Sequence, residues 1–545
     1  MEILSVKDLK FKYPSADNYA VNDISFGIQK GEIVVLCGVS GCGKTTLLRL
    51  LKREIAPFGT QSGTICFEGT EISALDSAVS ASRIGFVMQE PDTQIVTDAV
   101  WHELAFGLEN MGIKQSEIRR RVGEMASYFG IQGWFMQSTD SLSGGQKQLL
   151  NLASTMVMQP SLLLLDEPTS RLDPIAADEF ITTIQKLNSD FGLTVVIAEH
   201  RLDAILPIAG RVLLMHEGRL IVNSKPCDML SQLLAVDEQH PMLKAMPAPV
   251  RICASLFQDE KCVLTVRECK EALQKHYPDM HFTASIGEHR RFDKKAIEVN
   301  NVWFRYQKHS PDVLRGISLD VYQGEAVCIL GGNGVGKSTL VSVIAGIIKP
   351  TVGKVSIKDK LRLALLPQEP KALFLKDQVV AELSETALSI AGSRDAAEQK
   401  ISAVVSRFGI EALLQKHPYD LSGGEMQKCA IAKILLSSPD ILLLDEPTKG
   451  LDADAKQTLG DILKSLEADG ITMLIVTHDL DFAAENSDRC ALLFDGVITS
   501  DGYPDEFFAN NAFYTTSASR IARDIADGAV TVESVISTLG GRVNE

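Results

Sequence analysis

The chain has 545 residues, of which 45% are hydrophobic and 23% charged. This length is too great for one hydrophobic core, so at least two globular domains are expected, and the composition excludes a disordered or collagen-like chain. The formal net charge of −16 disfavours broad electrostatic binding to nucleic acid or to anionic lipid.

The sequence shows no targeting segment and no cysteine motif. The ten cysteines lack metal-site spacing, and we expect reduced thiols. No signal peptide opens the sequence, and every apolar run is far shorter than the roughly 20 residues that span a bilayer. The sequence therefore predicts a cytoplasmic protein whose membrane role, if any, depends on partners.

A glycine-rich segment, GVSGCGKTT, follows the apolar run EIVVLC and precedes TTLLRLL. Strand, loop and helix in this order are the context of a G-x-x-x-x-G-K-[ST] phosphate loop. Glycines let backbone N–H groups turn toward phosphate oxygens, Lys44 can reach the β and γ phosphates, and Thr45 can bind Mg²⁺. A ligand-free glycine turn is the alternative for one such segment alone. The predicted nucleotide contacts are Gly38, Val39, Ser40, Gly41, Cys42, Gly43, Lys44, Thr45 and Thr46.

A second apolar run, LLLLDE, ends in two carboxylates at Asp166 and Glu167. Buried parallel strands deliver such side chains to the carboxyl edge of a sheet, where ligands bind. We interpret Asp166 as a Mg²⁺ ligand and Glu167 as the group that orients or deprotonates the attacking water. A carboxylate that merely caps the next turn is the alternative, and the phosphate loop upstream disfavours it.

The whole pattern then occurs a second time. Tyr13 and Lys44 are answered 293 residues later by Tyr306 and Lys337, whereas the later motifs are answered after 279 residues. The second copy therefore lacks 14 residues between its phosphate loop and its Gln segment, where the first has TICFEGTEISALDSAVSASRIG, with strand, turn and helix signals. The corresponding nucleotide contacts are Gly331, Gly332, Asn333, Gly334, Val335, Gly336, Lys337, Ser338 and Thr339, with Asp445 as metal ligand and Glu446 as catalytic carboxylate.

The order of motifs resembles that of ATP-binding-cassette (ABC) ATPases. Each copy has a phosphate loop, a Gln segment (FVMQEP or LLPQEP), LSGGQ or LSGGE, DEPT and a later His. The resemblance implies two tandem α/β P-loop domains, each with a mixed sheet core, an antiparallel β subdomain and a helical subdomain. It places these domains at 1–225 and 296–505, with a partly helical linker at 226–295 and a helical tail at 506–545.

The same resemblance implies roles for the remaining motif residues. Tyr13 and Tyr306 would stack on adenine. Gln89 and Gln368 would link water, Mg²⁺ and partner, and so count as both catalytic and metal-binding. His200 and His478 would contact the γ-phosphate and complete the catalytic groups.

The signature segments are implied to work across the two copies. Ser143, Gly144, Gly145 and Gln146 would face the ATP held by Lys337, and Ser422, Gly423, Gly424 and Glu425 would face the ATP held by Lys44. Pairing of the two copies would then replace a homodimer, with two ATP sites formed head to tail. Glu425 stands where the family usually has Gln, which puts equal rates at the two sites in doubt.

The stretch QEPDTQIVTDAVWHELAFGLENMGI and the AEHRLD segment around His200 are similar to energy-coupling-factor (ECF) transporter ATPases. That resemblance implies an energy-coupling subunit for vitamin or metal uptake at the cytoplasmic face of the cell membrane, with a membrane scaffold and a substrate-binding subunit as partners. The match is weaker in the second copy.

Two other functions stay open. One is a soluble double cassette that acts on ribosomes or DNA. The acidic total and the lack of zinc modules or a basic arm disfavour it, and we expect no nucleic-acid partner. The other is the ATPase of a different ABC importer, which would use the same motifs.

Overall fold

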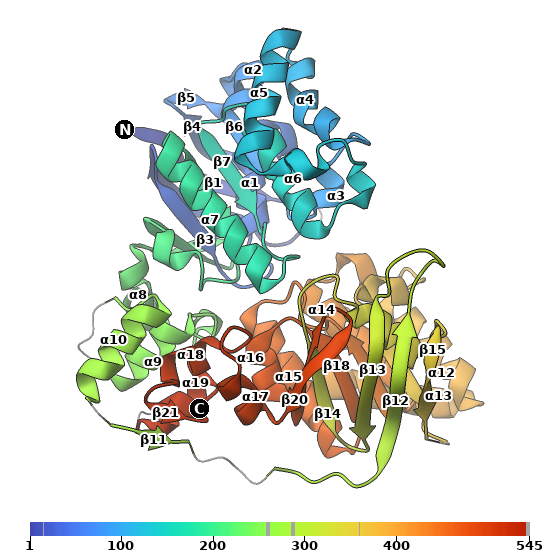
Figure 1. The fold of residues 1–545 in the computed structure, drawn as a ribbon. Coiled ribbons are helices and arrows are strands. Elements are labelled where there is room, and N and C mark those ends of the chain that lie inside the picture. The colour runs from blue at the N-terminus through green and yellow to red at the C-terminus, as the bar shows by residue number, and fades with distance from the viewer. Residues whose placement is uncertain (15, 258–261, 279, 285–288, 359, 541–545) are drawn as a thin grey trace. The chain divides into compact units, whose positions relative to one another are not determined.

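The structure is a computed structural model that describes the chain except for residues 15, 258–261, 279, 285–288, 359 and 541–545 (Figure 1). The chain divides into two compact units, Met1–Pro247 and Ala248–Glu545. Each unit contains one of the two repeats.

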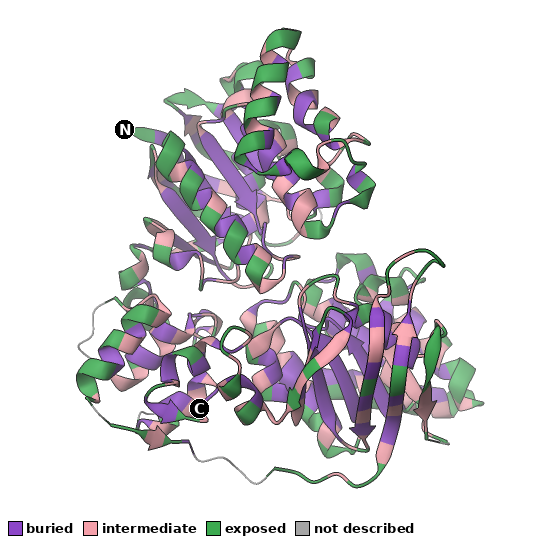
Figure 2. Cartoon of the chain, in the orientation of Figure 1, coloured by how far each residue is buried: buried purple, intermediate pink, exposed green. Residues whose placement is uncertain are grey.

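The core of the first unit is a six-stranded sheet in the order β10-β9-β3-β8-β7-β6. The five strands from β9 to β6 run parallel, and β10 pairs antiparallel at the edge. The bounds are β3 (Ile33–Cys37), β6 (Ile84–Val87), β7 (Leu162–Asp166), β8 (Thr194–Ala198), β9 (Arg211–His216) and β10 (Arg219–Ser224). Every residue of β3, β7 and β8 is buried, which explains their unbroken apolar sequences (Figure 2).

A second, antiparallel sheet of the first unit has the order β2-β1-β4-β5. Its strands are β1 (Glu2–Lys12), β2 (Val21–Gln29), β4 (Thr60–Phe67) and β5 (Thr70–Glu71). Side chains of both sheets, among them Phe11, Ile28, Leu36 and Leu164, share one hydrophobic core with the helix that follows the phosphate loop.

Helices complete the first unit. They include α1 (Lys44–Leu50), α3 (Pro91–Gln94), α4 (Val100–Asn110), α5 (Gln115–Tyr128), α6 (Gly144–Met156), α7 (Pro174–Phe191) and α8 (Met229–Val236). Helix α6 packs on α4 and α3, and so joins the signature segment to the segment after Gln89.

The second unit repeats the six-stranded order as β16-β17-β18-β14-β19-β20. Its strands are β14 (Ala326–Leu330), β16 (Leu363–Leu366), β17 (Ile441–Asp445), β18 (Thr472–Thr477), β19 (Arg489–Phe494) and β20 (Val497–Gly502). A three-stranded sheet in the order β13-β12-β15 covers it, formed by β12 (Lys295–Phe304), β13 (Leu314–Tyr322) and β15 (Val352–Ile357). The principal helices are α11 (Lys337–Ile344), α12 (Val379–Ala391), α13 (Arg394–Phe408), α14 (Gly423–Leu435), α15 (Ala453–Ala468), α16 (Leu480–Asn486) and α17 (Pro504–Asn510).

The copies differ where the sequence offset changes. The first copy has β5 and α2 (Ser77–Arg83) between β4 and β6, whereas residues 358–362 connect β15 to β16 in the second copy. Residue 359 of this connection is not described. The shorter second copy thus lacks a surface strand and helix and keeps the sheet core.

The predicted linker and tail contribute to one further structure, which we call the accessory module. It comprises α9 (Ala248–Leu256), α10 (Val266–His276), β11 (Phe282–Thr283), α18 (Ser517–Ala522), β21 (Ala526–Asp527) and α19 (Val532–Thr538). Strands β11 and β21 pair in parallel, and the helices share a core that includes Ile252, Leu273, Ile521 and Val535. The sequence did not indicate this packing, because a whole cassette separates the two segments and neither carries a motif.

Eight cysteines are free thiols: Cys37, Cys42, Cys66, Cys253, Cys269, Cys328, Cys429 and Cys490. These eight agree with the expectation of reduced thiols.

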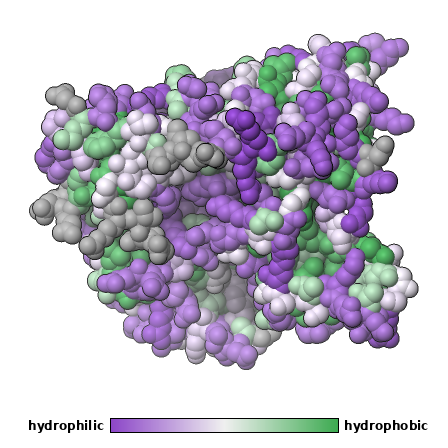
Figure 3. All heavy atoms as spheres, turned by 90° about the horizontal axis from the view of Figure 1, so that it is seen from below, coloured by the Kyte–Doolittle hydropathy of each residue, from purple (hydrophilic) through white to green (hydrophobic). Residues whose placement is uncertain are grey.

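In the described part of the chain, no helix combines the length and the apolar character needed to cross a membrane. The face drawn in Figure 3 is largely hydrophilic, with hydrophobic residues in small separate areas.

Candidate functional site

The first phosphate loop connects β3 to α1, as the sequence predicted. Gly41 and Gly43 have φ angles of +78° and +104°, a region that residues with a side chain rarely adopt. A Cβ on Gly43 would lie only 2.1 Å from the carbonyl oxygen of Ala20. The turn therefore needs glycine both for its backbone angles and for space.

Lys44 is buried and folds back over this loop. Its Nζ donates hydrogen bonds to the carbonyl oxygens of Gly38 at 2.9 Å and Val39 at 3.2 Å. The same nitrogen lies 3.9 Å from Glu167 Oε1. The ammonium group is thus held beside the loop backbone, where a phosphate-loop lysine serves.

Thr45 and Asp166 form a pair of oxygen donors at the carboxyl edge of the sheet. Thr45 Oγ1 donates to Asp166 Oδ1 at 2.9 Å. Burial raises the pKa of Asp166 to about 6, although the bond from Thr45 lowers it. Among the described residues, no three His, Cys, Asp or Glu side chains form a metal-binding group. A few hard oxygen ligands fit Mg²⁺, which keeps waters and phosphate oxygens in its shell.

Glu167 contacts two other predicted catalytic residues of the first site, Gln89 and His200. Its φ of +44° is unusual for a residue with a side chain, and such strain is often found at functional positions. Gln89 Nε2 donates to Glu167 Oε2 at 2.7 Å, and His200 Nε2 lies 2.7 Å from Oε1. Two residues that are 78 and 33 positions away in the chain are therefore brought to one carboxylate.

The second copy repeats this arrangement. Lys337 Nζ donates to the carbonyl oxygens of Gly331 at 2.9 Å and Gly332 at 3.0 Å. Ser338 Oγ donates to Asp445 Oδ1 at 3.0 Å, and burial raises the pKa of Asp445.

Glu446 corresponds to Glu167 and also has a positive φ, +52°. It lies 2.7 Å from His478 Nδ1 and 3.2 Å from Lys337 Nζ. Burial raises the pKa of Glu446, but the bond and charge of His478 and the charge of Lys337 outweigh it, so the pKa is below its usual range. The carboxylate is therefore kept ionised.

The two sites are not identical. His200 faces its glutamate with Nε2, whereas His478 uses Nδ1. Gln89 contacts Glu167, but Gln368 is exposed, and the partners of Glu446 are His478 and Lys337. The structure thus brings five of the six predicted catalytic residues together at the two glutamates.

The two tyrosines lie beside their phosphate loops. Tyr13 OH is 3.0 Å from Thr46 Oγ1, and Tyr306 OH is 2.9 Å from Thr339 Oγ1. Tyr306 is 66% exposed and lines a cavity of about 510 Å³ together with Gly334 and Val335 of the loop. An aromatic face beside the phosphate loop suits a flat base such as adenine.

Each signature segment forms the N-terminus of a long helix. Ser143 Oγ accepts from Gln146 N at 3.3 Å, and Gln146 Oε1 accepts from Ser143 N at 2.9 Å. Ser422 and Glu425 make the same reciprocal pair, and Lys416 lies 3.2 Å from Glu425. A carboxylate caps this helix as well as an amide does, so replacement of Gln by Glu leaves the local fold intact.

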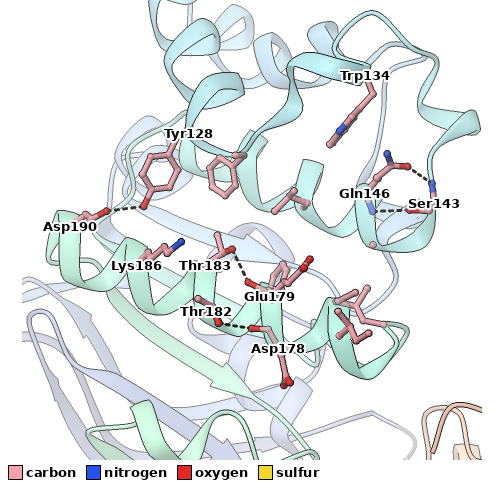
Figure 4. Close-up of a pocket in the computed structure, with 17 residues that line it drawn as sticks. Tyr128, Trp134, Ser143, Gln146, Asp178, Glu179, Thr182, Thr183, Lys186 and Asp190 are labelled. Carbon is pink, nitrogen blue, oxygen red and sulfur yellow. Dashed lines mark hydrogen bonds between the residues drawn. The ribbon is translucent and has the colours of Figure 1, made fainter. Parts of the chain in front are cut away.

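The first signature segment opens onto a groove of about 870 Å³. Ser143, Gly145 and Gln146 line one part of it, and side chains of α7 line the other (Figure 4). Gly144 is exposed beside them, as is Gly423 in the second copy, while Gly424 is partly exposed. The signature backbone is therefore accessible to a ligand.

The sequence interpretation missed one buried polar residue at the first site. Glu199, next to His200, accepts hydrogen bonds from Thr169 of the DEPT segment. The sequence hinted at Glu199 only by placing an acidic residue at the end of the apolar run TVVIAEH. The second copy has Thr477 at this position.

Comparison with known proteins agrees with this geometry. The ABC transporter family model matches residues 21–170 and 314–449. A putative ABC transporter ATP-binding protein of Bacillus thuringiensis subsp. konkukian is 39% identical over 97% of both chains. The putative HMP/thiamine import ATP-binding protein YkoD of Bacillus subtilis is 32% identical over 93% of both chains.

Solved structures add agreement in fold. A model of ribosome-bound archaeal Pelota and ABCE1 matches with a TM-score of 0.62 and 20% identity, covering 92% of this chain and 79% of that one. Two family matches on one polypeptide, each placed on a complete phosphate-loop site, show what the chain is. It belongs to the ABC transporter family and carries two ATP-binding, ATP-hydrolysing cassettes.

Proposed function

We propose that the chain is the energy-coupling subunit of an ECF-type membrane importer for a vitamin or metal-related micronutrient, working at the cytoplasmic face of the membrane. The observation that carries this proposal is a pair of matching apolar residues. Val96 is 67% exposed in the first copy, and Leu375, its counterpart 279 positions later, is 86% exposed in the second. A single exposed apolar side chain is ordinary, but its recurrence at the equivalent position of both cassettes supports a contact with a protein partner.

The loops that present these residues are braced in the same way. Glu103 of α4 is buried, and its Oε2 accepts from the backbone N–H of Val96 at 3.1 Å and of Thr97 at 2.8 Å. Glu382 of α12 takes the backbone N–H groups of Leu375 and Lys376 in the same manner. A buried glutamate holds each apolar residue outward, as a docking surface requires.

Similarity to YkoD, whose name describes HMP/thiamine import, supports uptake over other uses of the cassettes. The ribosome-associated structures are only 20% identical and support the fold alone. We therefore favour import over an action on ribosomes.

Hydrolysis is proposed to depend on the residues gathered at each glutamate. Glu167 and Glu446 accept a proton from water as its oxygen attacks the γ-phosphorus and the bond to ADP breaks, which yields ADP and phosphate. Lys44 and Lys337 hold the β and γ phosphates. Thr45, Asp166 and Gln89, or Ser338, Asp445 and Gln368, would hold Mg²⁺, which neutralises phosphate charge when bound.

The signature segments are proposed to complete the sites head to tail, each serving the ATP of the other copy. Their exposed backbone N–H groups at helix N-termini suit a γ-phosphate. A chain with both Ser143→Arg and Ser422→Arg should lose turnover while both phosphate loops still bind ATP. Normal turnover of this variant would contradict the arrangement.

Docking is tested with Val96→Asp and Leu375→Asp in one chain. Affinity purification from native membranes should recover polytopic subunits with the wild-type chain and lose most of them with the double variant. Phe58→Asp is the matched control, because Phe58 is 88% exposed in the first unit outside this segment. Equal recovery by the double variant, or no polytopic protein with the wild type, would count against the proposal.

A further inference from the structure

Glu199 lies between the two loops that carry Glu167 and His200. Its side chain is only 2% exposed. Oε1 accepts from Thr169 N at 3.0 Å and from Thr169 Oγ1 at 2.7 Å. Oε2 accepts from the backbone N–H of His200 at 3.2 Å. One carboxylate thus ties the turn after Glu167 to the histidine that faces Glu167.

The backbone around Glu199 is also hydrogen-bonded to strand β3 and to the loop that carries Glu167. Glu199 N donates to the carbonyl oxygen of Leu36 in β3 at 3.2 Å, two residues before the phosphate loop. Glu167 N donates to the carbonyl oxygen of Ala198 at 3.0 Å. Residues 198 and 199 therefore touch the phosphate-loop strand, the DEPT turn and the histidine together.

A buried carboxyl at this place is unfavourable unless its contacts compensate. Burial raises the pKa of Glu199, and the bonds from Thr169 offset this only in part. The side chain of Glu199 accepts hydrogen bonds from Thr169 and His200, so its contacts are with the loops that hold the site.

The second copy has a different side chain at the position of Glu199. Thr477 stands at the equivalent position, and its hydroxyl is 3.2 Å from Thr448 Oγ1 and accepts from Asp479 N at 3.1 Å. A single hydroxyl there replaces a carboxylate that takes three bonds. In that copy the histidine also meets its glutamate through the other ring nitrogen, Nδ1.

We propose that Glu199 is a positioning residue of the first ATPase site, which holds Thr169 and His200 so that His200 Nε2 stays against Glu167. Turnover at the first site then depends on a contact that the second site lacks. The inference rests on the proposed role of Glu167 in hydrolysis. It assigns Glu199 no contact with the reacting atoms.

The test compares Glu199→Thr and Glu199→Gln in the full chain. Threonine is the residue of the second copy, so the fold is expected to tolerate it, but it cannot reach both Thr169 and His200. We expect turnover at the first site to fall about tenfold or more, as for loss of a residue that orients an active-site group, so that kcat of the whole chain falls to the contribution of the second site, with KM within about threefold. Glutamine keeps an acceptor for Thr169 but places an amide N–H against the backbone N–H of His200, so it should recover only part of the loss.

The matched control is Glu32→Gln. Glu32 also accepts from a backbone N–H, that of Gln29, and pairs with Arg211, but it precedes β3 at the end away from the phosphate loop. It should leave kcat unchanged. Wild-type kcat in Glu199→Thr, or equal losses in Glu199→Thr and Glu199→Gln, would overturn the positioning role.

The variant Glu167→Gln distinguishes failure of the proposed role of Glu199 from failure of the proposed role of Glu167. Glu167→Gln should lower kcat at least as far as Glu199→Thr does. Wild-type turnover with Glu167→Gln would refute the base assignment, and with it the role of Glu199. Loss with Glu167→Gln but none with Glu199→Thr would refute the positioning role alone.

Discussion

His200 Nε2 lies 2.7 Å from Glu167 Oε1, so the two side chains that follow adjacent parallel strands β8 and β7 meet directly. The corresponding pair in the second copy, His478 and Glu446, meets at the same distance through a different ring nitrogen. The chain therefore carries two complete glutamate–histidine pairs with unequal surroundings. Both are expected to support hydrolysis, at different rates.

Removal of either phosphate-loop lysine should remove one ATP. Lys44→Ala and Lys337→Ala each delete an ammonium group that is fixed over loop carbonyls and would otherwise contact phosphates. Equilibrium dialysis with a non-hydrolysable ATP analogue should give two bound nucleotides for the wild type and about one for each variant. Two bound nucleotides in both variants would defeat the phosphate-loop assignment.

The first phosphate loop should not tolerate a side chain at Gly43. In Gly43→Ala the new Cβ would meet the carbonyl oxygen of Ala20 at 2.1 Å, in a backbone conformation with φ of +104°. We expect ATP affinity at this loop to fall by tenfold or more, on the order of 1.4 kcal/mol. Gly133→Ala is the control, because a Cβ there has no neighbour within 4 Å. Equal affinities for the two variants would show that the loop accommodates the clash.

The buried parallel strands beside these loops were predicted from the sequence, because unbroken apolar runs such as LLLLD are typical of such strands, whose carboxyl ends lie at one edge of a sheet. This shared edge in turn predicted that Lys44, Asp166 and Glu167 would lie together. Other features depended on contacts between distant segments. The accessory module joins Cys253 and Ile521 in one core, which no local pattern encodes. The exposure of Gln368 and the bonds of Glu199 likewise depend on loop geometry.

Stability of the first unit should depend on pH through Asp166. Its pKa of about 6 in the folded chain is above the value of about 3.9 for an exposed aspartate, so the unfolded state loses this proton first. The native state is therefore penalised by the buried charge above pH 6, and the penalty disappears as pH falls toward 4. Asp166→Asn removes the charge at every pH.

We expect Asp166→Asn to raise the unfolding temperature at pH 7.5 in the absence of nucleotide, by a few degrees at most. The difference from the wild type should shrink between pH 6 and pH 4. Thermal unfolding followed by circular dichroism measures it. A difference that is constant over this pH range would show that the Asp166 charge does not set it.

The central claim is that Glu167 and Glu446 accept the proton of the attacking water. The most direct test measures phosphate release by a chain that carries both Glu167→Gln and Glu446→Gln. Each substitution keeps the shape of the side chain and removes the proton acceptor. We expect kcat to fall by about a hundredfold or more while two ATP molecules remain bound. Turnover at the wild-type rate in this double variant would contradict the claim.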